Sequence, residues 1–126
     1  DNIEESEQVM NTAKIVNEWK VGDNGEVRRD NSLISSDCQN FTIRFSDGNS
    51  YVVQNDPMNV FQPSGTWRFA EGTFSEIILN SDRRPISIEY SNNDEILMLR
   101  FRLEDDQPIG SRSIGLSGSY EFHLNK

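Results

Sequence analysis

Hydrophobic and polar side chains alternate with a period of two along most of this chain. In the segment Phe41–Phe45, hydrophobic side chains occupy the odd positions, while Thr42 and Arg44 occupy the even ones. This alternation is typical of a β-strand with one buried face and one face in water. Eight segments share the pattern and are predicted to be strands: 15–21, 41–45, 51–55, 66–70, 74–80, 86–90, 95–103 and 119–124.

Short polar turns connect most of the predicted strands. Asp47-Gly48 lies between two of them, and Gly48 can adopt the positive φ of a hairpin turn. Such short connections place successive strands antiparallel, in an up-and-down meander. Closing a meander of about eight strands into a barrel removes its two unpaired edges. The sequence therefore predicts an all-β fold, an antiparallel barrel, with residues 22–40 as a loop that holds at most a short strand near Val27.

The first fourteen residues do not follow this alternation. Acidic and polar residues separate the hydrophobic ones there, and early glutamates suit the N-terminal end of a helix dipole. We predict a short helix over residues 3–14, packed across or beside one barrel opening. The expected organisation is an N-terminal helix or linker and one barrel domain, residues 1–14 and 15–126.

Two segments of the chain echo each other, Ser64–Phe69 (SGTWRF) and Ser117–Phe122 (SGSYEF). We interpret the echo as the way in which two strands begin, and not as a binding motif used twice. Gly65 and Gly118 would let the chain turn into a strand, and the two following aromatic side chains would point inward on one face.

The chain is acidic, and this limits its partners. It has 21 Asp and Glu against 12 Lys and Arg, which gives a net charge of -9. An acidic surface repels phosphate backbones and anionic lipid surfaces, so we expect no nucleic-acid partner and no direct adhesion to a membrane. The single cysteine, Cys38, excludes an intrachain disulfide, and no arginine or lysine lies beside it to make the thiol reactive.

The order of several short motifs resembles one protein family. The motifs are NEWKV, FTIRFSDGNSYVV, PSGTWRF, IILN, ISIEY, ILMLRF and GLSGSYEFHL, and they cover roughly residues 15–126. This succession is similar to that of the small lipocalin-like lipoproteins exported by Bacteroidota bacteria. The resemblance implies a lipocalin-like barrel in the periplasm, at the outer membrane or on the cell surface. It also implies contact with the membrane only through a lipid anchor on a cysteine lost from the N-terminus.

Aromatic residues give the best indication of a binding site. An eight-stranded barrel is just wide enough to be filled by side chains or to hold one small ligand, and both alternatives stay open at this point. A cavity would lie near the loop 56–65, whose hydrophobic residues would form a flexible lip. The residues predicted to contact a ligand are Trp19, Tyr51, Met58, Phe61, Trp67, Tyr90 and Tyr120.

The function expected from these features is that of a non-enzymatic envelope module. Its partner would be a small apolar ligand in the barrel or another envelope protein. The alternative is a carbohydrate-binding β domain that exposes aromatic rings, and a hydrolase with carboxylate chemistry ranks third. The exposure of Trp67 distinguishes the first two, since a sugar platform needs an accessible ring.

No catalytic residue, metal ligand or cofactor is predicted. His123 is the only histidine, alternates outward, and has no Gly-x-Ser-x-Gly elbow to pair with in the sequence. The acidic stretches 23–26 and 104–106 lack the ligand spacing of a calcium loop. Arg28-Arg29 and Arg83-Arg84 are interpreted as loop pairs that hold a carboxylate or phosphate, or that balance the surrounding acid.

Overall fold

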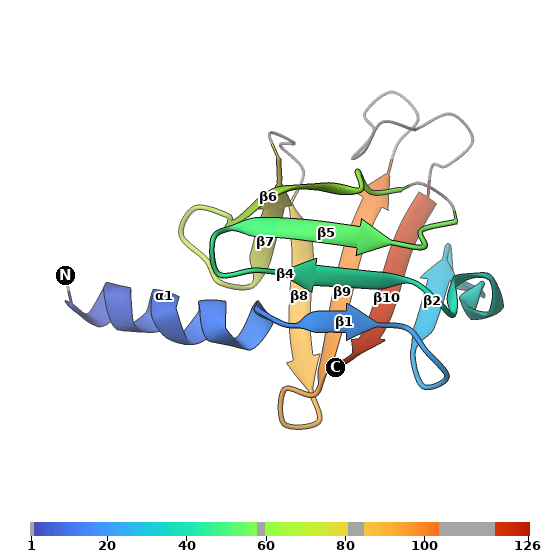
Figure 1. The fold of residues 1–126 in the computed structure, drawn as a ribbon, viewed down its shortest axis with the longest axis horizontal. Helices are drawn as coiled ribbons and strands as arrows, with labels where there is room; N and C mark the ends of the chain where they lie inside the picture. Colours follow the sequence, from blue (N-terminus) through green and yellow to red (C-terminus); the bar gives the residue numbers. More distant parts are fainter. Residues whose placement is uncertain (1, 58–59, 81–84, 104–117) are drawn as a thin grey trace.

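The computed structural model describes residues 2–57, 60–80, 85–103 and 118–126. Within these ranges, eight antiparallel strands close into a barrel, and one α-helix precedes them (Figure 1). The predicted all-β barrel with a short N-terminal helix is therefore confirmed. The elements are α1 (Asn2–Ile15), β1 (Glu18–Lys20), β2 (Glu26–Arg29), β3 (Ser32–Leu33), the 3-10 helix η1 (Ser35–Cys38), β4 (Thr42–Phe45), β5 (Ser50–Gln54), β6 (Ser64–Phe69), β7 (Glu76–Leu79), β8 (Ile86–Ser91), β9 (Ile96–Leu103) and β10 (Gly118–Asn125).

The barrel is an up-and-down meander with one inserted hairpin. Its strands pair in the order β1-β4-β5-β6-β7-β8-β9-β10, and β1 pairs with β10 between Lys20 and Asn125 to close the ring. The inserted hairpin, β2 and β3, extends the sheet from β10 through β2. In Figure 1, β1, β4 and β5 cross in front of β8, β9 and β10, so the barrel consists of two crossed layers.

The hairpin of β2 and β3 corrects the prediction of a loop over residues 22–40. A short strand near Val27 was expected, and β2 contains that residue with its side chain fully buried. β3 was not predicted, because both of its residues, Ser32 and Leu33, are exposed and give no alternation. Pairing with β10, and not a buried face of β3, therefore holds this hairpin in the sheet.

The core consists of the inward-facing residues of the strands. Six of them were expected to be buried, and each is at most 6% exposed: Trp19, Ile43, Trp67, Ile88, Leu99 and Phe122. These side chains belong to one continuous cluster of buried hydrophobic residues that includes contributions from both layers. The prediction of a single core is confirmed.

Helix α1 lies elsewhere than predicted. Figure 1 shows it running away from the barrel, and its residues Val9 and Met10 are 67% and 63% exposed. Of the helix residues whose side chains are described, 7–15, only Ile15 enters the core, and its carbonyl oxygen accepts a hydrogen bond of 2.9 Å from Nε1 of Trp19. The prediction that the helix packs across or beside a barrel opening is wrong. Its few hydrophobic residues do not form a stripe broad enough to pack on the barrel.

The two echoing segments begin strands, as predicted. At the start of each strand, a backbone N–H also donates to the side chain of an Asn or Asp residue. At the start of β6, the N–H of Thr66 donates to Oδ1 of Asn80 (3.0 Å), and the N–H of Asn80 donates to the carbonyl oxygen of Thr66 (2.7 Å). Asn80 has a positive φ of 57°, and a Cβ atom on Gly65 would overlap its Oδ1. Gly65 therefore leaves room for the asparagine side chain.

The start of β10 repeats this arrangement with an aspartate. The N–H of Ser119 donates to Oδ1 of Asp30 (2.9 Å), and the N–H of Asp30 donates to the carbonyl oxygen of Ser119 (2.8 Å). Asp30 also has a positive φ, of 51°, and a Cβ atom on Gly118 would lie 2.8 Å from its Oδ2. We call these two arrangements, Gly65–Thr66–Asn80 and Gly118–Ser119–Asp30, the Gly-Asx clamps. The echo in the sequence thus corresponds to a repeated structural device.

Candidate functional site

Six of the seven residues predicted to contact a ligand lie in the described part of the chain. Tyr90 is half-buried, and Met58 lies outside the described residues. The other five are inside the barrel and at most 4% exposed: Trp19, Tyr51, Phe61, Trp67 and Tyr120.

These aromatic rings lie in separate groups, and within each group the rings contact one another. Trp19 meets Tyr90 with ring centroids 6.4 Å apart. Phe61 and Tyr120 both contact Phe101, with centroids 5.4 and 5.3 Å away. Contacts at these distances are those of packed aromatic side chains. The structure thus brings together Trp19 with Tyr90, and Phe61 with Tyr120 through Phe101. In both cases the rings are in contact as packed core side chains.

Trp67 does not offer a surface for sugar stacking. It is 2% exposed, its Nε1 donates to the carbonyl oxygen of Ser46 (3.0 Å), and its ring meets Phe45 at 5.7 Å. Because the ring is covered, Trp67 is part of the core. Across the described part of the chain, the large hydrophobic residues that are exposed are all aliphatic, namely Val9, Met10, Leu33 and Val52.

The buried hydroxyl and thiol groups are in their protonated forms at neutral pH. Burial is the main cause that raises the pKa of Tyr51, Tyr90 and Tyr120. The hydroxyl of Tyr51 accepts a hydrogen bond of 2.9 Å from Nδ2 of Asn80. Burial, followed by the nearby carboxylates of two aspartates, raises the pKa of the Cys38 thiol to about 11. None of these groups is prepared to act as a nucleophile.

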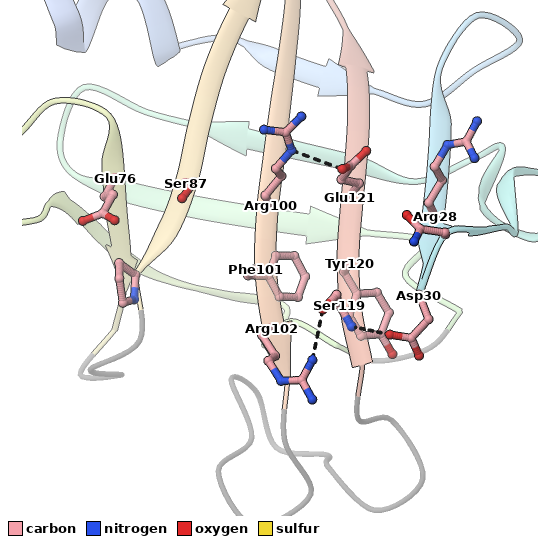
Figure 2. Close-up of a pocket in the computed structure, with 12 residues that line it drawn as sticks. Arg28, Asp30, Glu76, Ser87, Arg100, Phe101, Arg102, Ser119, Tyr120 and Glu121 are labelled. Atoms are coloured by element: carbon pink, nitrogen blue, oxygen red, sulfur yellow. Dashed lines mark hydrogen bonds and ion pairs between the residues drawn. The ribbon is translucent and has the colours of Figure 1, made fainter.

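A second candidate site lies on the outside of the barrel (Figure 2). It is a concave region of about 560 Å³ that crosses β7, β8, β9, β10 and β2. We call it the outer groove and define it by the outward-facing residues that line it on these strands: Arg28, Glu76, Ser87, Arg100, Arg102, Ser119 and Glu121. Asp30, Asn31 and Pro85 also line it, and the inward-facing Phe101 and Tyr120 form part of its floor.

Strand register brings five of these residues into one row across the sheet. Arg28 of β2 faces Glu121 of β10, and Glu121 faces Arg100 of β9. Arg100 in turn faces Ser87 of β8, and Ser87 faces Glu76 of β7. The row therefore alternates positive and negative charge and then reaches a serine, whose small side chain leaves the floor low between Arg100 and Glu76.

The arginines of the groove take part in ion pairs and hydrogen bonds. Nε of Arg100 lies 3.2 Å from Oε2 of Glu121, and its Nη1 lies 3.6 Å from Oε1 of Glu89. Nη1 of Arg102 donates to the hydroxyl oxygen of Ser119 (3.1 Å), as the dashed lines in Figure 2 show for this pair and for Arg100–Glu121. These contacts hold the guanidinium groups over the groove.

The pKa of the Glu121 carboxyl lies below its ordinary value. Its Oε1 lies 3.0 Å from Nε2 of His123, and this hydrogen bond is the main cause that lowers the pKa of Glu121. The charge of Arg100 and its hydrogen bond lower that pKa further. Glu121 is therefore ionised over the physiological pH range, and His123 is bonded to a carboxylate.

The interpretation of Arg28 and Arg29 as a loop pair is wrong, because both belong to β2. Arg28 points outward and its Nη2 lies 3.0 Å from Oε1 of Glu26. The guanidinium of Arg29 lies over the ring of Tyr120, 5.7 Å from its centroid. Arg28 therefore forms an ion pair on the outer surface, whereas Arg29 packs over an aromatic ring. Two further predicted clusters lie outside the described residues: Arg83-Arg84 and 104–106.

The outer groove was not predicted from the sequence, although Arg100 and Arg102 gave one indication of it. Arg100 and Arg102 occupy alternate positions of one strand and must therefore point to the same face. Which other residues join them depends on the pairing of β10 with both β9 and β2, and the hairpin containing β2 was not predicted.

Among the described residues, no group of three or more His, Cys, Asp or Glu lies close enough to hold a metal ion.

No family model matches this chain, and no curated protein and no solved structure matches it either. Within the described residues, no helix has both the length and the apolar character needed to cross a membrane. The groove and the core therefore have to be interpreted from their own chemistry.

Proposed function

We propose that this chain is a non-enzymatic binding or interaction module that contacts its partner with the outer surface of the barrel. The packed interior carries this proposal. Phe41, Phe61 and Phe122 contact one another there with ring centroids 4.9 to 5.8 Å apart. A ligand at that point would have to separate these rings, and it would lose packing that a folded core needs.

The outer groove supports recognition from outside. It is the place where three of the twelve basic residues of an acidic chain gather, on a rigid sheet and not on a loop. Side chains held by strands form more exact binding sites than side chains on mobile segments. The non-enzymatic part of the proposal is supported by His123, whose ring nitrogen is bonded to Glu121 and not to a nucleophile of the described residues.

The proposed location is the cell envelope, with export to the periplasm, the outer membrane or the cell surface as a lipoprotein. The order of the motifs from NEWKV to GLSGSYEFHL supports this part. Fractionation of cells that express the full gene product, with metabolic labelling by a radioactive fatty acid, tests it. Unlabelled protein in the soluble cytoplasmic fraction would contradict the proposal.

A dye assay separates recognition on the outer surface from an apolar ligand inside the barrel. The folded protein is titrated with an environment-sensitive hydrophobic dye, and the unfolded protein in denaturant serves as the reference. We expect no saturable binding, because a dye inside the barrel would have to break the contacts of Phe122 with Phe41 and Phe61. Stoichiometric dye binding that a fatty acid displaces, and that Phe61→Ala alters, would overturn the proposal in favour of an interior ligand.

A further inference from the structure

The described part of helix α1 leaves two large hydrophobic side chains in water. Val9 and Met10 are 67% and 63% exposed, and Figure 1 shows the helix running away from the barrel. An isolated helix of about 12–15 residues is only marginally stable in water, and helices of this length normally depend on a packed face. Because α1 has 14 residues, we expect it to gain stability when a partner covers this face.

The hydrophobic side chains lie on one side of the helix. Met10 and Ala13 are three residues apart, and Val9 and Ala13 are four apart, so all three share one face. In heptad notation, Met10 occupies position a, Ala13 position d and Val9 the flanking position g. Such a stripe is too narrow to pack on the barrel, but it has the width of the seam between two paired helices.

Two residues of opposite charge flank the other side of this stripe. Glu7 and Lys14 are seven residues apart, so both occupy heptad position e, and both are exposed. When two helices pair antiparallel, position e of one faces position e of the other, whereas in a parallel pair it faces position g. Two antiparallel copies of α1 would therefore place Glu7 of each copy beside Lys14 of the other, in two equivalent ion pairs.

The distribution of charge along the helix favours the same orientation. By sequence, the acidic residues of α1 lie in its first half, and its one basic residue, Lys14, lies in its last turn. Antiparallel pairing brings the acidic half of each helix beside the basic end of the other, whereas parallel pairing would place acid beside acid. Nζ of Lys14 lies 5.6 Å from the centroid of the Tyr90 ring, and an ammonium in that position retains N–H groups for a carboxylate.

From this arrangement we propose that α1 is a self-association site, which pairs antiparallel with α1 of a second copy of this chain. Met10 and Ala13 of both copies form the seam, and Glu7 and Lys14 form the flanking ion pairs. A pair of helices this short buries less than the roughly 1,200 Å² of a stable specific complex, so the dimer is weak. This inference goes beyond the proposed function, because it concerns α1 and not the barrel surface, and either can fail alone.

Sedimentation equilibrium over a range of protein concentrations tests the inference. It is measured at physiological salt, where repulsion between the distant charges of two acidic copies is screened. We expect the average mass to rise from 14.5 kDa toward twice that value, with a Kd on the order of 100 μM. A protein that stays monomeric up to about 1 mM would overturn the inference.

Two variants with the same change of charge locate the contact on the helix. Met10→Glu places a carboxylate in the seam and should abolish dimer formation within the measured range. The matched control is Gln8→Glu, because Gln8 is exposed on the opposite side of the same helix and its substitution should leave the Kd unchanged. A dimer that survives Met10→Glu, or an equal loss in Gln8→Glu, would contradict the inference.

Charge reversal tests the antiparallel orientation. Lys14→Glu places two glutamates in each flanking pair and should weaken the dimer by roughly tenfold. The double variant Glu7→Lys/Lys14→Glu rebuilds both pairs with exchanged charges and should recover most of that loss. An unchanged dimer in Lys14→Glu, or a double variant as weak as the single one, would overturn the antiparallel pairing. Each variant is first compared with the wild type by thermal unfolding, because Lys14 also contacts Tyr90.

Discussion

Substitution of Gly65 by alanine should destabilise the protein because it removes the space for one side chain. The backbone of Gly65 has an ordinary negative φ, so alanine itself fits there, but its Cβ atom would overlap Oδ1 of Asn80. The asparagine side chain would have to leave the first Gly-Asx clamp. The three atoms nearest to that Cβ all belong to Asn80, so the loss of stability should depend on the Asn80 side chain.

The magnitude follows from the hydrogen bonds of Asn80. Its side chain accepts from the N–H of Thr66 and donates to the hydroxyl of Tyr51 and to Oε1 of Gln62, at 3.0, 2.9 and 2.9 Å. At about 1 kcal/mol each, these bonds contribute about 3 kcal/mol. An alanine that fits stabilises by about 0.4–1 kcal/mol through the unfolded chain, so the net loss should be about 2 kcal/mol.

A double-mutant cycle isolates this effect. Asn80→Gly removes the obstructing side chain and tolerates the positive φ of 57°. In that background, Gly65→Ala should stabilise the protein by about 0.4–1 kcal/mol, which gives a coupling energy of about 3 kcal/mol between the two positions. The free energy of unfolding is measured by urea titration, with the fluorescence of the buried Trp19 and Trp67 as the signal.

Gly48→Ala is the matched control for this cycle. A Cβ atom at Gly48 meets no other atom within 4 Å, so its effect should stay within about 0.5 kcal/mol. The reasoning would be refuted if Gly65→Ala were as stable as the wild type. It would equally be refuted if the variant lost the same stability in the presence and in the absence of the Asn80 side chain.

Three further predictions concern the core, the outer groove and the thiol. Trp67→Ala should lower the free energy of unfolding by about 3–5 kcal/mol, since it removes a large ring that is 2% exposed, and an unchanged melting temperature would contradict this. The pKa of Glu121 is lowered in the folded state, so its stabilising contribution is present above its ordinary value of 4.5 and is lost as the pH falls through the folded pKa. The stability difference between wild type and Glu121→Gln, measured in denaturant at a series of pH values, should therefore shrink on acidification, and a difference that grows would exclude the ion-pair account. Burial raises the pKa of Cys38 to about 11, so a thiol reagent at neutral pH should react with the unfolded protein and hardly at all with the folded one.

The sequence predicted the barrel well because its strands carry complete alternation. Phe41, Ile43 and Phe45 repeat at every second position, and their burial follows directly from that pattern. β3 was missed because its two residues are both exposed. Local alternation reports whether a strand has a buried face, but not which distant strand it pairs with. For the same reason the order of pairing around β10 could not be derived.

The outer groove was missed for a different reason. Its members come from five strands, and only the register brings Arg28 beside Glu121 and Arg100 beside Ser87. Outward positions of a strand are polar in any soluble barrel, so their composition alone does not mark a site. The interior aromatics were recognised in the sequence, but whether they packed on one another or lined a cavity depended on distances such as the 4.9 Å between Phe41 and Phe122.

Strand β10 imposes an order on the biosynthesis of this protein. It pairs with β9, β2 and β1, and it therefore joins strands that lie about 100 residues apart in the sequence, such as Lys20 and Asn125. Until Gly118–Asn125 have been synthesised, β9, β2 and the closing edge of β1 lack this neighbour, and the barrel cannot form its ring. Contacts between residues so far apart in sequence also form slowly. We therefore expect the barrel to stay unfolded until residues 118–125 have left the ribosome.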